Sequence, residues 1–243
     1  MRRYDAFSIK LIMITLMVLD HIECLIPADI ALVFHVMSRC VIPWFGYMAV
    51  EGFIHTRSRV GYIKRLSLWA VLMFSGNTLL NFCFKDKPEL FLENNIFLTL
   101  AIGVLILHLL SGIEYGMTAE EILKITFAFL LSVVAYMYTE GGFVLIPFML
   151  ITYYLRENER TRNIIYVALS ALLFIIGFSL KSTVMETFLS LLADGSFLFI
   201  TVLPFIYLYN GKRGRNTKFN KYFFYVFYPL HLWIITAAAY YFT

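Results

Sequence analysis

The sequence predicts an all-α fold, a bundle of about nine transmembrane helices surrounded by lipid. Of the 243 residues, 60% are hydrophobic and only 15% are charged, whereas soluble domains are about 45–50% apolar and about 25% charged. Apolar runs follow one another along the chain, and many approach the roughly 20 residues that cross a hydrocarbon core. No hydrophilic stretch is long enough to fold as a soluble domain, so residues 1–243 are expected to form one transmembrane domain.

The first helix is expected at 8–26. A basic segment, 1–10, precedes it, but the apolar run is long, contains Asp20 and His21, and lacks a small-residue cleavage site. These features indicate a permanent span rather than a cleaved signal peptide.

The other helices are expected where apolar runs lie between charged or turn-forming segments. The runs at 142–156 and 163–180 are short, so the count can differ by one. Asp194-Gly195 interrupts the eighth run, whose outer half is a candidate for a separate short helix. The eight predicted helices are 30–54, 66–84, 95–112, 119–138, 142–156, 163–180, 186–210 and 219–242.

The distribution of basic residues predicts a cytoplasmic N-terminus. With that orientation, sixteen of the 20 Lys and Arg residues lie in inner segments or at the inner ends of spans. Lys85, Lys87 and Lys181 lie on the outer side. Cytoplasmic loops of membrane proteins carry such an excess of positive charge.

Ionisable side chains inside the predicted spans are candidates for function, because each costs at least about 2.5–3.5 kcal/mol near the bilayer centre. Lys10 and His21 are eleven residues apart, which places them on nearly one face of a helix and about 16 Å apart along it. Asp20 lies about 100° around the same helix. It is expected either to reach the imidazole of His21 or to pair with Arg39; an interfacial Asp20–His21 pair is the structural alternative.

Two i,i+4 pairs follow in the second predicted span. His35 and Arg39 form one, and Glu51 and His55 form the other, next to Arg57. The second group is either an interfacial salt-bridge cluster or a positively charged mouth for a phosphate-bearing donor. Side chains with an expected structural role are Asn77 and Asn81, which can join helices by hydrogen bonds, and His108.

His231 lies in the middle of the last predicted span. Tyr228 precedes it by three residues, and Pro229 removes a backbone donor and can bend the helix there. A mid-membrane imidazole beside a bend is either a helix-packing residue or one that faces a polar cavity.

Four blocks of the sequence resemble the TraX family, polytopic proteins associated with acetylation of the N-terminus of conjugative pilin. The blocks together run nearly from end to end. They are Lys10 to Ile22 with Asp20-His21; Arg39-x-x-x-Pro43-x-Phe45 with Glu51-Gly-Phe-x-His55-Thr56-Arg57 and Tyr62-x-x-Arg65-Leu66; Asn94-Asn95-Ile-Phe97 with Gly103; and Gly211-Lys-Arg-Gly214 with Lys218 and Phe224-Tyr225-x-x-Tyr228-Pro229-x-His231-Leu232. More distantly, Lys10 and His21 are similar to the basic residue and catalytic His, ten residues between them, of transmembrane acyltransferases.

The resemblance implies acyl transfer from acetyl-CoA to an amine, or to a hydroxyl, at the bacterial inner membrane. It implies His21 as general base, Asp20 as its electrostatic partner, and His231 or Tyr228 as a second acid, base or oxyanion donor. The implied acceptor is a pilin-like or envelope peptide or a small amine. Many transmembrane acyltransferases have Arg where this chain has Lys10. Lysine keeps the positive charge but lacks the planar guanidinium group that can bind a phosphate through two hydrogen bonds.

The phosphate groups of CoA are expected to contact Lys and Arg side chains on the cytoplasmic side of the membrane. The same cations can instead enforce topology and contact anionic lipid. The non-enzymatic alternatives are a transporter and an envelope or pilus-assembly scaffold. No metal is expected, because the five histidines are scattered, and no nucleic-acid partner is expected. The predicted donor-binding residues are Lys10, Arg39, Glu51, His55, Arg57, Arg65, Asn95, Lys212, Arg213 and Lys218.

Overall fold

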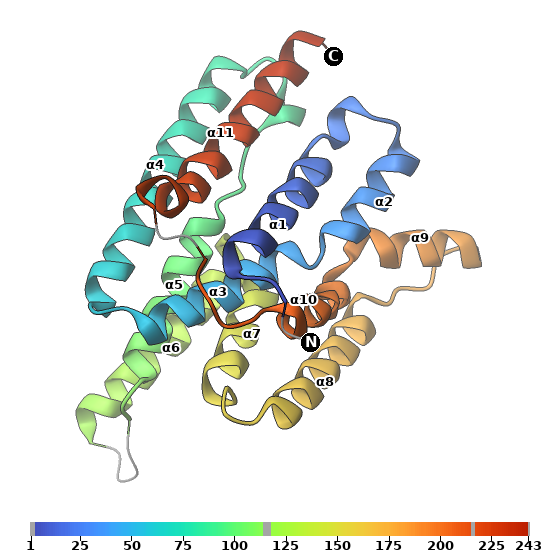
Figure 1. Ribbon diagram of the computed structural model, residues 1–243. Helices are drawn as coiled ribbons and strands as arrows, with labels where there is room; N and C mark the ends of the chain where they lie inside the picture. The colour runs from blue at the N-terminus through green and yellow to red at the C-terminus, as the bar shows by residue number, and fades with distance from the viewer. Residues whose placement is uncertain (1–2, 114–117, 215–216, 243) are drawn as a thin grey trace. The chain divides into compact units, whose positions relative to one another are not determined.

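The predicted all-α fold is confirmed by the computed structural model, which describes residues 3–113, 118–214 and 217–242. Those residues form helices and connecting segments without a strand, apart from one isolated bridge between Tyr4 and Tyr209 (Figure 1). The α-helices are α1 (Ala6–His21), α2 (Ala28–Ser38), α3 (Val41–His55), α4 (Arg59–Cys83), α5 (Ile96–Leu110), α6 (Ala119–Tyr138), α7 (Gly142–Tyr154), α8 (Glu159–Gly177), α9 (Val184–Asp194), α10 (Leu203–Leu208) and α11 (Lys218–Phe242). Short 3₁₀ helices are η1 (Glu23–Leu25), η2 (Pro88–Leu90) and η3 (Ser196–Val202).

Within the described residues, five helices are long and apolar enough to cross a membrane, and a bent pair would make six. The expected number of about nine spans is not reached by this criterion, because α1, α5 and α7 have only 16, 15 and 13 residues. The helix predicted at 8–26 ends at His21, and the chain turns through η1. The candidate spans are Ala28–His55, Arg59–Cys83, Ala119–Tyr138, Glu159–Gly177 and Tyr222–Phe242, and the bent pair is Val184–Asp194 with Ser196–Leu208.

The predicted interruption at Asp194-Gly195 is confirmed. α9 ends there, and the following segment continues at an angle of 58°. Gly195 has φ +58°, a left-handed conformation that side chains with a Cβ disfavour. Its amide closes α9 by bonding to the carbonyl of Leu191.

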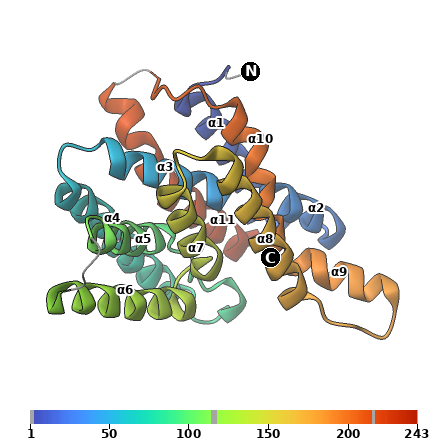
Figure 2. The ribbon, with the colours of Figure 1, turned by 90° about the horizontal axis from the view of Figure 1, so that it is seen from below.

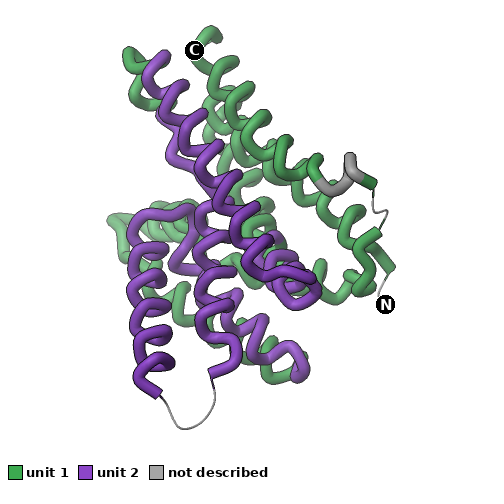
Figure 3. The backbone as a smooth tube through the Cα atoms, turned by 90° about the vertical axis from the view of Figure 1, so that its left-hand side faces the viewer, with its two compact units in different colours: residues 1–44, 84–90, 159–243 green, residues 45–83, 91–158 purple. Residues whose placement is uncertain are grey.

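The chain divides into two compact units, and each is described by itself (Figure 3). Unit 1 comprises residues 1–44, 84–90 and 159–243. In it, α1 packs against α2 and α11, α8 packs along η3, and α9 contacts α2. The buried face of α1 carries Ile9, Met13 and Met17 at helical spacing. This packing brings the first and last helices of the chain together.

Unit 2 comprises residues 45–83 and 91–158. Its centre is α5, which packs against α4, α6 and α7 and is buried on nearly every side (Figure 2). A helix surrounded by protein can be shorter than the bilayer is thick, because neighbouring helices rather than lipid cover its ends.

An extended segment leads into α5, and asparagines of α4 bind its backbone. Asn81 exchanges two hydrogen bonds with Leu92, of 2.8 and 3.1 Å. Asn77 donates to the carbonyl of Asn94 at 2.9 Å. The expected structural role of both asparagines is therefore confirmed, but their partners are in a connecting segment rather than on a second helix.

Candidate functional site

Two histidines from opposite ends of the sequence meet inside unit 1. His21 lies in the last turn of α1, and His231 lies near the middle of α11. Nε2 of His231 is 3.4 Å from Nδ1 of His21, and the ring planes meet at 70° with centroids 5.1 Å apart. His231 is 6% exposed. The packing of α1 on α11 therefore creates a pair of imidazoles in a largely buried setting.

The neighbours of each ring indicate which nitrogen carries the proton. Nδ1 of His21 is 2.7 Å from the carbonyl oxygen of Met17, and Nδ1 of His231 is 3.0 Å from that of Phe227. A carbonyl oxygen only accepts, so in the neutral rings Nδ1 is the donor and Nε2 carries the lone pair. Nε2 of His21 has no hydrogen-bond partner in the described part of the chain. It is thus the nitrogen available to accept a proton.

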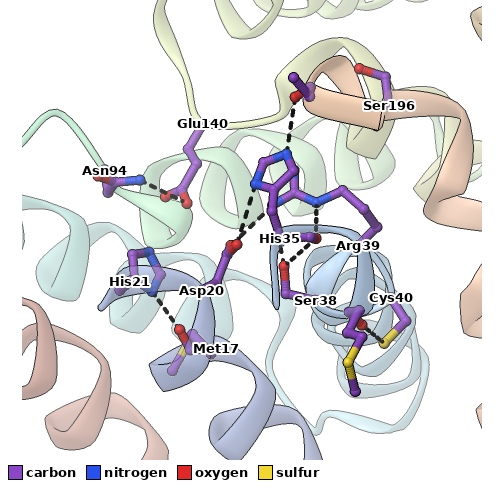
Figure 4. Close-up of polar contacts among 12 residues, drawn as sticks. Met17, Asp20, His21, His35, Ser38, Arg39, Cys40, Asn94, Glu140 and Ser196 are labelled. Carbon is purple, nitrogen blue, oxygen red and sulfur yellow. Dashed lines mark hydrogen bonds and ion pairs between the residues drawn. The ribbon is translucent and has the colours of Figure 1, made fainter. Parts of the chain in front are cut away.

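Within the described residues, the carboxylate of Asp20 is not hydrogen-bonded to His21. Its Oδ2 accepts from Nη2 of Arg39 at 2.9 Å, and its Oδ1 lies 3.3 Å from Nδ1 of His35 (Figure 4). The alternative pairing with Arg39 is therefore the observed one. Asp20 and His21 point away from each other because they are adjacent on the helix, about 100° apart. The main-chain carbonyl of Met17 orients His21 in the place of a carboxylate.

Lys10 lies on α1, nearer its N-terminus. Its Nζ is 5.0 Å from the centroid of the Phe224 ring of α11, a cation–π distance. The segment before α11 folds against the same end of α1, because the amide of Ala6 donates to the carbonyl of Lys212 at 2.9 Å. Three of the predicted donor-binding cations, Lys10, Lys212 and Arg213, are thereby brought to one end of α1; the side chain of Lys218 lies outside the described residues.

Tyr228 packs edge-on against the ring of His231, with centroids 5.6 Å apart, and is 6% exposed. On the other side, Phe227 stacks on His231 with the planes 9° apart. The two aromatic rings fix the orientation of the imidazole.

The other predicted donor-binding residues belong to unit 2. Glu51 and His55 form an ion pair of 3.7 Å, and Arg57 is exposed. The guanidinium of Arg65 lies 5.5 Å from the ring of Tyr62. Asn95 caps α5 by accepting from the amide of Leu98 and donates to the carbonyl of Ala70 at 2.9 Å. These bonds occupy its amide group and favour a structural role for Asn95 over contact with a donor.

His35 is a member of this site that was not among the predicted catalytic or donor-binding residues. Its spacing from Arg39 was visible as an i,i+4 pair, but its two partners come from α1 and α9. Nothing in the sequence places these three helices side by side.

The chain is similar in sequence to known proteins over nearly its whole length. A family model described as "TraX protein" matches residues 6–238. The probable fimbrial assembly protein FimC, serogroup H1, of Dichelobacter nodosus is 28% identical over 245 residues, which cover 97% of this chain and 96% of that protein. No solved structure matches the chain. The family match spans α1 to α11 and includes both histidines of the pair, so the chain belongs to the TraX protein family.

Proposed function

We propose that this chain is a multi-pass acyltransferase of the bacterial inner membrane, which moves an acetyl group from acetyl-CoA to an amine, and less readily to a hydroxyl. The observation that carries the proposal is the His21–His231 pair, in which Nδ1 of His21 is held by a carbonyl and Nε2 is left to take a proton. The family membership supports the choice of reaction, because acetyl transfer is what the TraX resemblance implies.

The chemistry needs one base and one positively charged region. Nε2 of His21 takes a proton from the acceptor amine as nitrogen forms a bond to the acetyl carbonyl carbon. The carbon–sulfur bond of the thioester then breaks, and the CoA sulfur leaves with the proton that the imidazolium returns. His231, whose Nε2 faces the Nδ1–H of His21, stabilises the positive charge that develops on that ring.

The cations near the start of α1 are proposed to receive the phosphates of CoA. Lys10, Lys212 and Arg213 share that end of α1, and phosphate groups are bound by such clusters. With a cytoplasmic N-terminus, as the distribution of Lys and Arg predicts, this end faces the compartment that contains acetyl-CoA. About nine spans remains the proposed topology, with α1, α5 and α7 counted as short membrane-embedded helices.

The proposed acceptor is a pilin-like or envelope peptide. FimC of Dichelobacter nodosus is described as a probable fimbrial assembly protein, and we infer from this that the acceptor of the present chain is a subunit of such an assembly. The amino terminus of such a subunit is an amine that can approach from the outer side or from the lipid.

A transporter is the second candidate function, favoured by the 58° bend in the span at Gly195. Transporter sites are often formed by interrupted helices near the middle of the membrane. Thermal unfolding in detergent separates the two candidates, because a ligand that binds the folded state raises its melting temperature. Acetyl-CoA at millimolar concentration should raise it if the chain is an acyltransferase; no shift favours the transporter.

Transfer itself is tested with purified protein in proteoliposomes, radiolabelled acetyl-CoA and a synthetic peptide with a free amino terminus. The native chain should label the peptide, and His21→Ala should reduce the rate by at least about 10²-fold, the usual contribution of a general base. His108→Gln is the matched control, because it removes an imidazole from α5, in unit 2. Equal labelling by native protein and His21→Ala would exclude His21 as the base.

A further inference from the structure

The imidazole of His35 connects three helices of unit 1. It projects from α2, and its Nε2 lies 3.0 Å from the carbonyl oxygen of Ala193, in the last turn of α9. Its Nδ1 lies 3.3 Å from Oδ1 of Asp20, in the last turn of α1. Figure 4 shows the ring of His35 facing the carboxylate of Asp20. One side chain thus contacts the end of α1 next to His21 and the end of α9 next to the break.

Both atoms that the ring faces are acceptors. A carbonyl oxygen cannot donate, so Nε2 of His35 carries a proton toward Ala193. A lone pair on Nδ1 would face the carboxylate of Asp20 and repel it, whereas an N–H there attracts it. The Asp20 contact is electrostatic rather than a well-aligned hydrogen bond, since Oδ1 accepts none by geometry.

Arg39 completes the connection one turn farther along the chain. Its Nη2 donates to Asp20 at 2.9 Å, and its Nε donates to the carbonyl of His35 at 3.0 Å. Its aliphatic stem lies against Gly195, where an added Cβ would be 2.9 Å from Cδ of Arg39. The bend in the span is therefore packed directly on the side chain that anchors Asp20.

The polar groups at this junction are few and come from known elements. α1 contributes Asp20 and His21, α2 and its C-cap contribute His35, Ser38 and Arg39, and α9 contributes Asp194. Asp194 binds elsewhere, because its carboxylate accepts from the amide and hydroxyl of Ser196. The carbonyl of Ala193 is one of the last four of α9, which have no partner inside the helix. His35 supplies a donor for it.

We propose that His35 is a positioning residue: its ring joins the broken end of α9 to the last turn of α1 and so holds His21 in the geometry of the imidazole pair. The second half of this statement, on His21, rests on the proposed function. The first half does not, because it concerns only how the last turn of α9, and with it the bend at Gly195, is held in place. Loss of the N–H groups of His35 should therefore free the end of α9 and loosen the position of His21 in the last turn of α1.

The bend can be measured without any enzymatic assay. Spin labels at Val184→Cys and Thr201→Cys lie on the two arms of the bent pair, at exposed positions, in a background that lacks Cys24, Cys40 and Cys83. Double electron–electron resonance then gives the distribution of distances between the arms. His35→Phe keeps a ring of similar size but has no donor, whereas His35→Gln keeps two N–H donors on one amide.

The expected result is a clearly broader distance distribution for His35→Phe, a native-like one for His35→Gln, and no change for the control His108→Phe in unit 2. In the acetyl-transfer assay His35→Phe should lower kcat about tenfold, with KM for acetyl-CoA unchanged, and His35→Gln should restore most of it. A native distribution in His35→Phe would overturn the proposal. If His35→Phe does not fold, Asp20→Asn tests the same contact, and an unchanged distribution there overturns it equally.

Failure of the proposed function would look different. Suppose that His35→Phe broadens the distance distribution while the native protein transfers no acetyl group. The link that His35 makes between the helices would then stand, and the proposed acyltransferase activity would be rejected. If His35→Phe has a native distance distribution and the native protein transfers acetyl groups, the acyltransferase proposal would stand and the positioning role of His35 would be rejected.

Discussion

Nε2 of His231 lies 3.4 Å from Nδ1 of His21, although 210 residues separate the two along the chain. Both rings also face a carbonyl oxygen of their own helix through Nδ1, at 2.7 and 3.0 Å. Each helix therefore orients its own imidazole through a backbone carbonyl. The pair resembles a catalytic dyad whose orienting acceptor is the backbone instead of a carboxylate.

Asp20→Asn should separate stability from catalysis. The change removes the charge that pairs with Arg39 but leaves the carbonyl of Met17 that orients His21. We expect the free energy of unfolding to fall by about 2 kcal/mol, typical of a hydrogen bond between charged groups, and the acetyl-transfer rate to fall less than in His21→Ala. Thermal melts and transfer assays on both variants test this. A larger rate loss in Asp20→Asn than in His21→Ala would show that the carboxylate acts directly.

His231→Phe should abolish the proposed acetyl transfer without unfolding the protein. A phenyl ring can keep the stacking on Phe227, at 5.3 Å between centroids, but has no nitrogen to face His21. Acid–base partners contribute about 10²–10⁴-fold to rate, so kcat should fall at least about 10²-fold. Circular dichroism and the melting temperature should stay close to native, as they should in His108→Phe. An active His231→Phe variant would assign the residue to packing.

Lys10→Met should weaken binding of the donor rather than the chemical step. The Lys10 ammonium lies 5.0 Å from the Phe224 ring, on the same helix as His21 but nearer the start. Loss of one charge contact to phosphate should raise KM for acetyl-CoA about tenfold, equivalent to about 1.4 kcal/mol, with kcat little changed. Lys10→Arg should restore KM. An effect on kcat alone would place Lys10 in the reaction instead.

Two glycine substitutions separate backbone strain from packing at the bend. Gly195 and Gly112 both have positive φ, +58° and +93°. A Cβ at Gly195 would lie 2.9 Å from Arg39, whereas a Cβ at Gly112 meets nothing within 4 Å. Each Ala variant should lose about 1–2 kcal/mol to the left-handed backbone, and Gly195→Ala should lose more. Comparison of their melting temperatures measures the difference. Equal losses of stability in the two variants would mean that the side chain of Arg39 moves away from the added methyl group at no cost.

The sequence predicted which segments form helices better than it predicted where those helices begin and end. The helix expected at 119–138 is α6 without correction, because the Thr118–Glu121 capping box and a charged first turn mark its start. The helix expected at 8–26 starts two residues too late and ends five residues too late, because α1 spans Ala6–His21 and the chain then turns into η1. Hydropathy does not detect that turn, because Ile22, Leu25 and Ile26 are as apolar as the helix before them.

Composition and hydropathy alone determined that this chain is an α-helical membrane protein, because a lipid solvent requires apolar side chains and internally bonded backbone. They also identified His21 and His231, since ionisable groups are rare and costly in such segments. Only the tertiary structure decided which side chains these ionisable groups contact. Asp20 is adjacent to His21 in sequence but binds Arg39, because neighbouring residues diverge by about 100° on a helix. His231 is distant in sequence but meets His21, because α11 packs on α1.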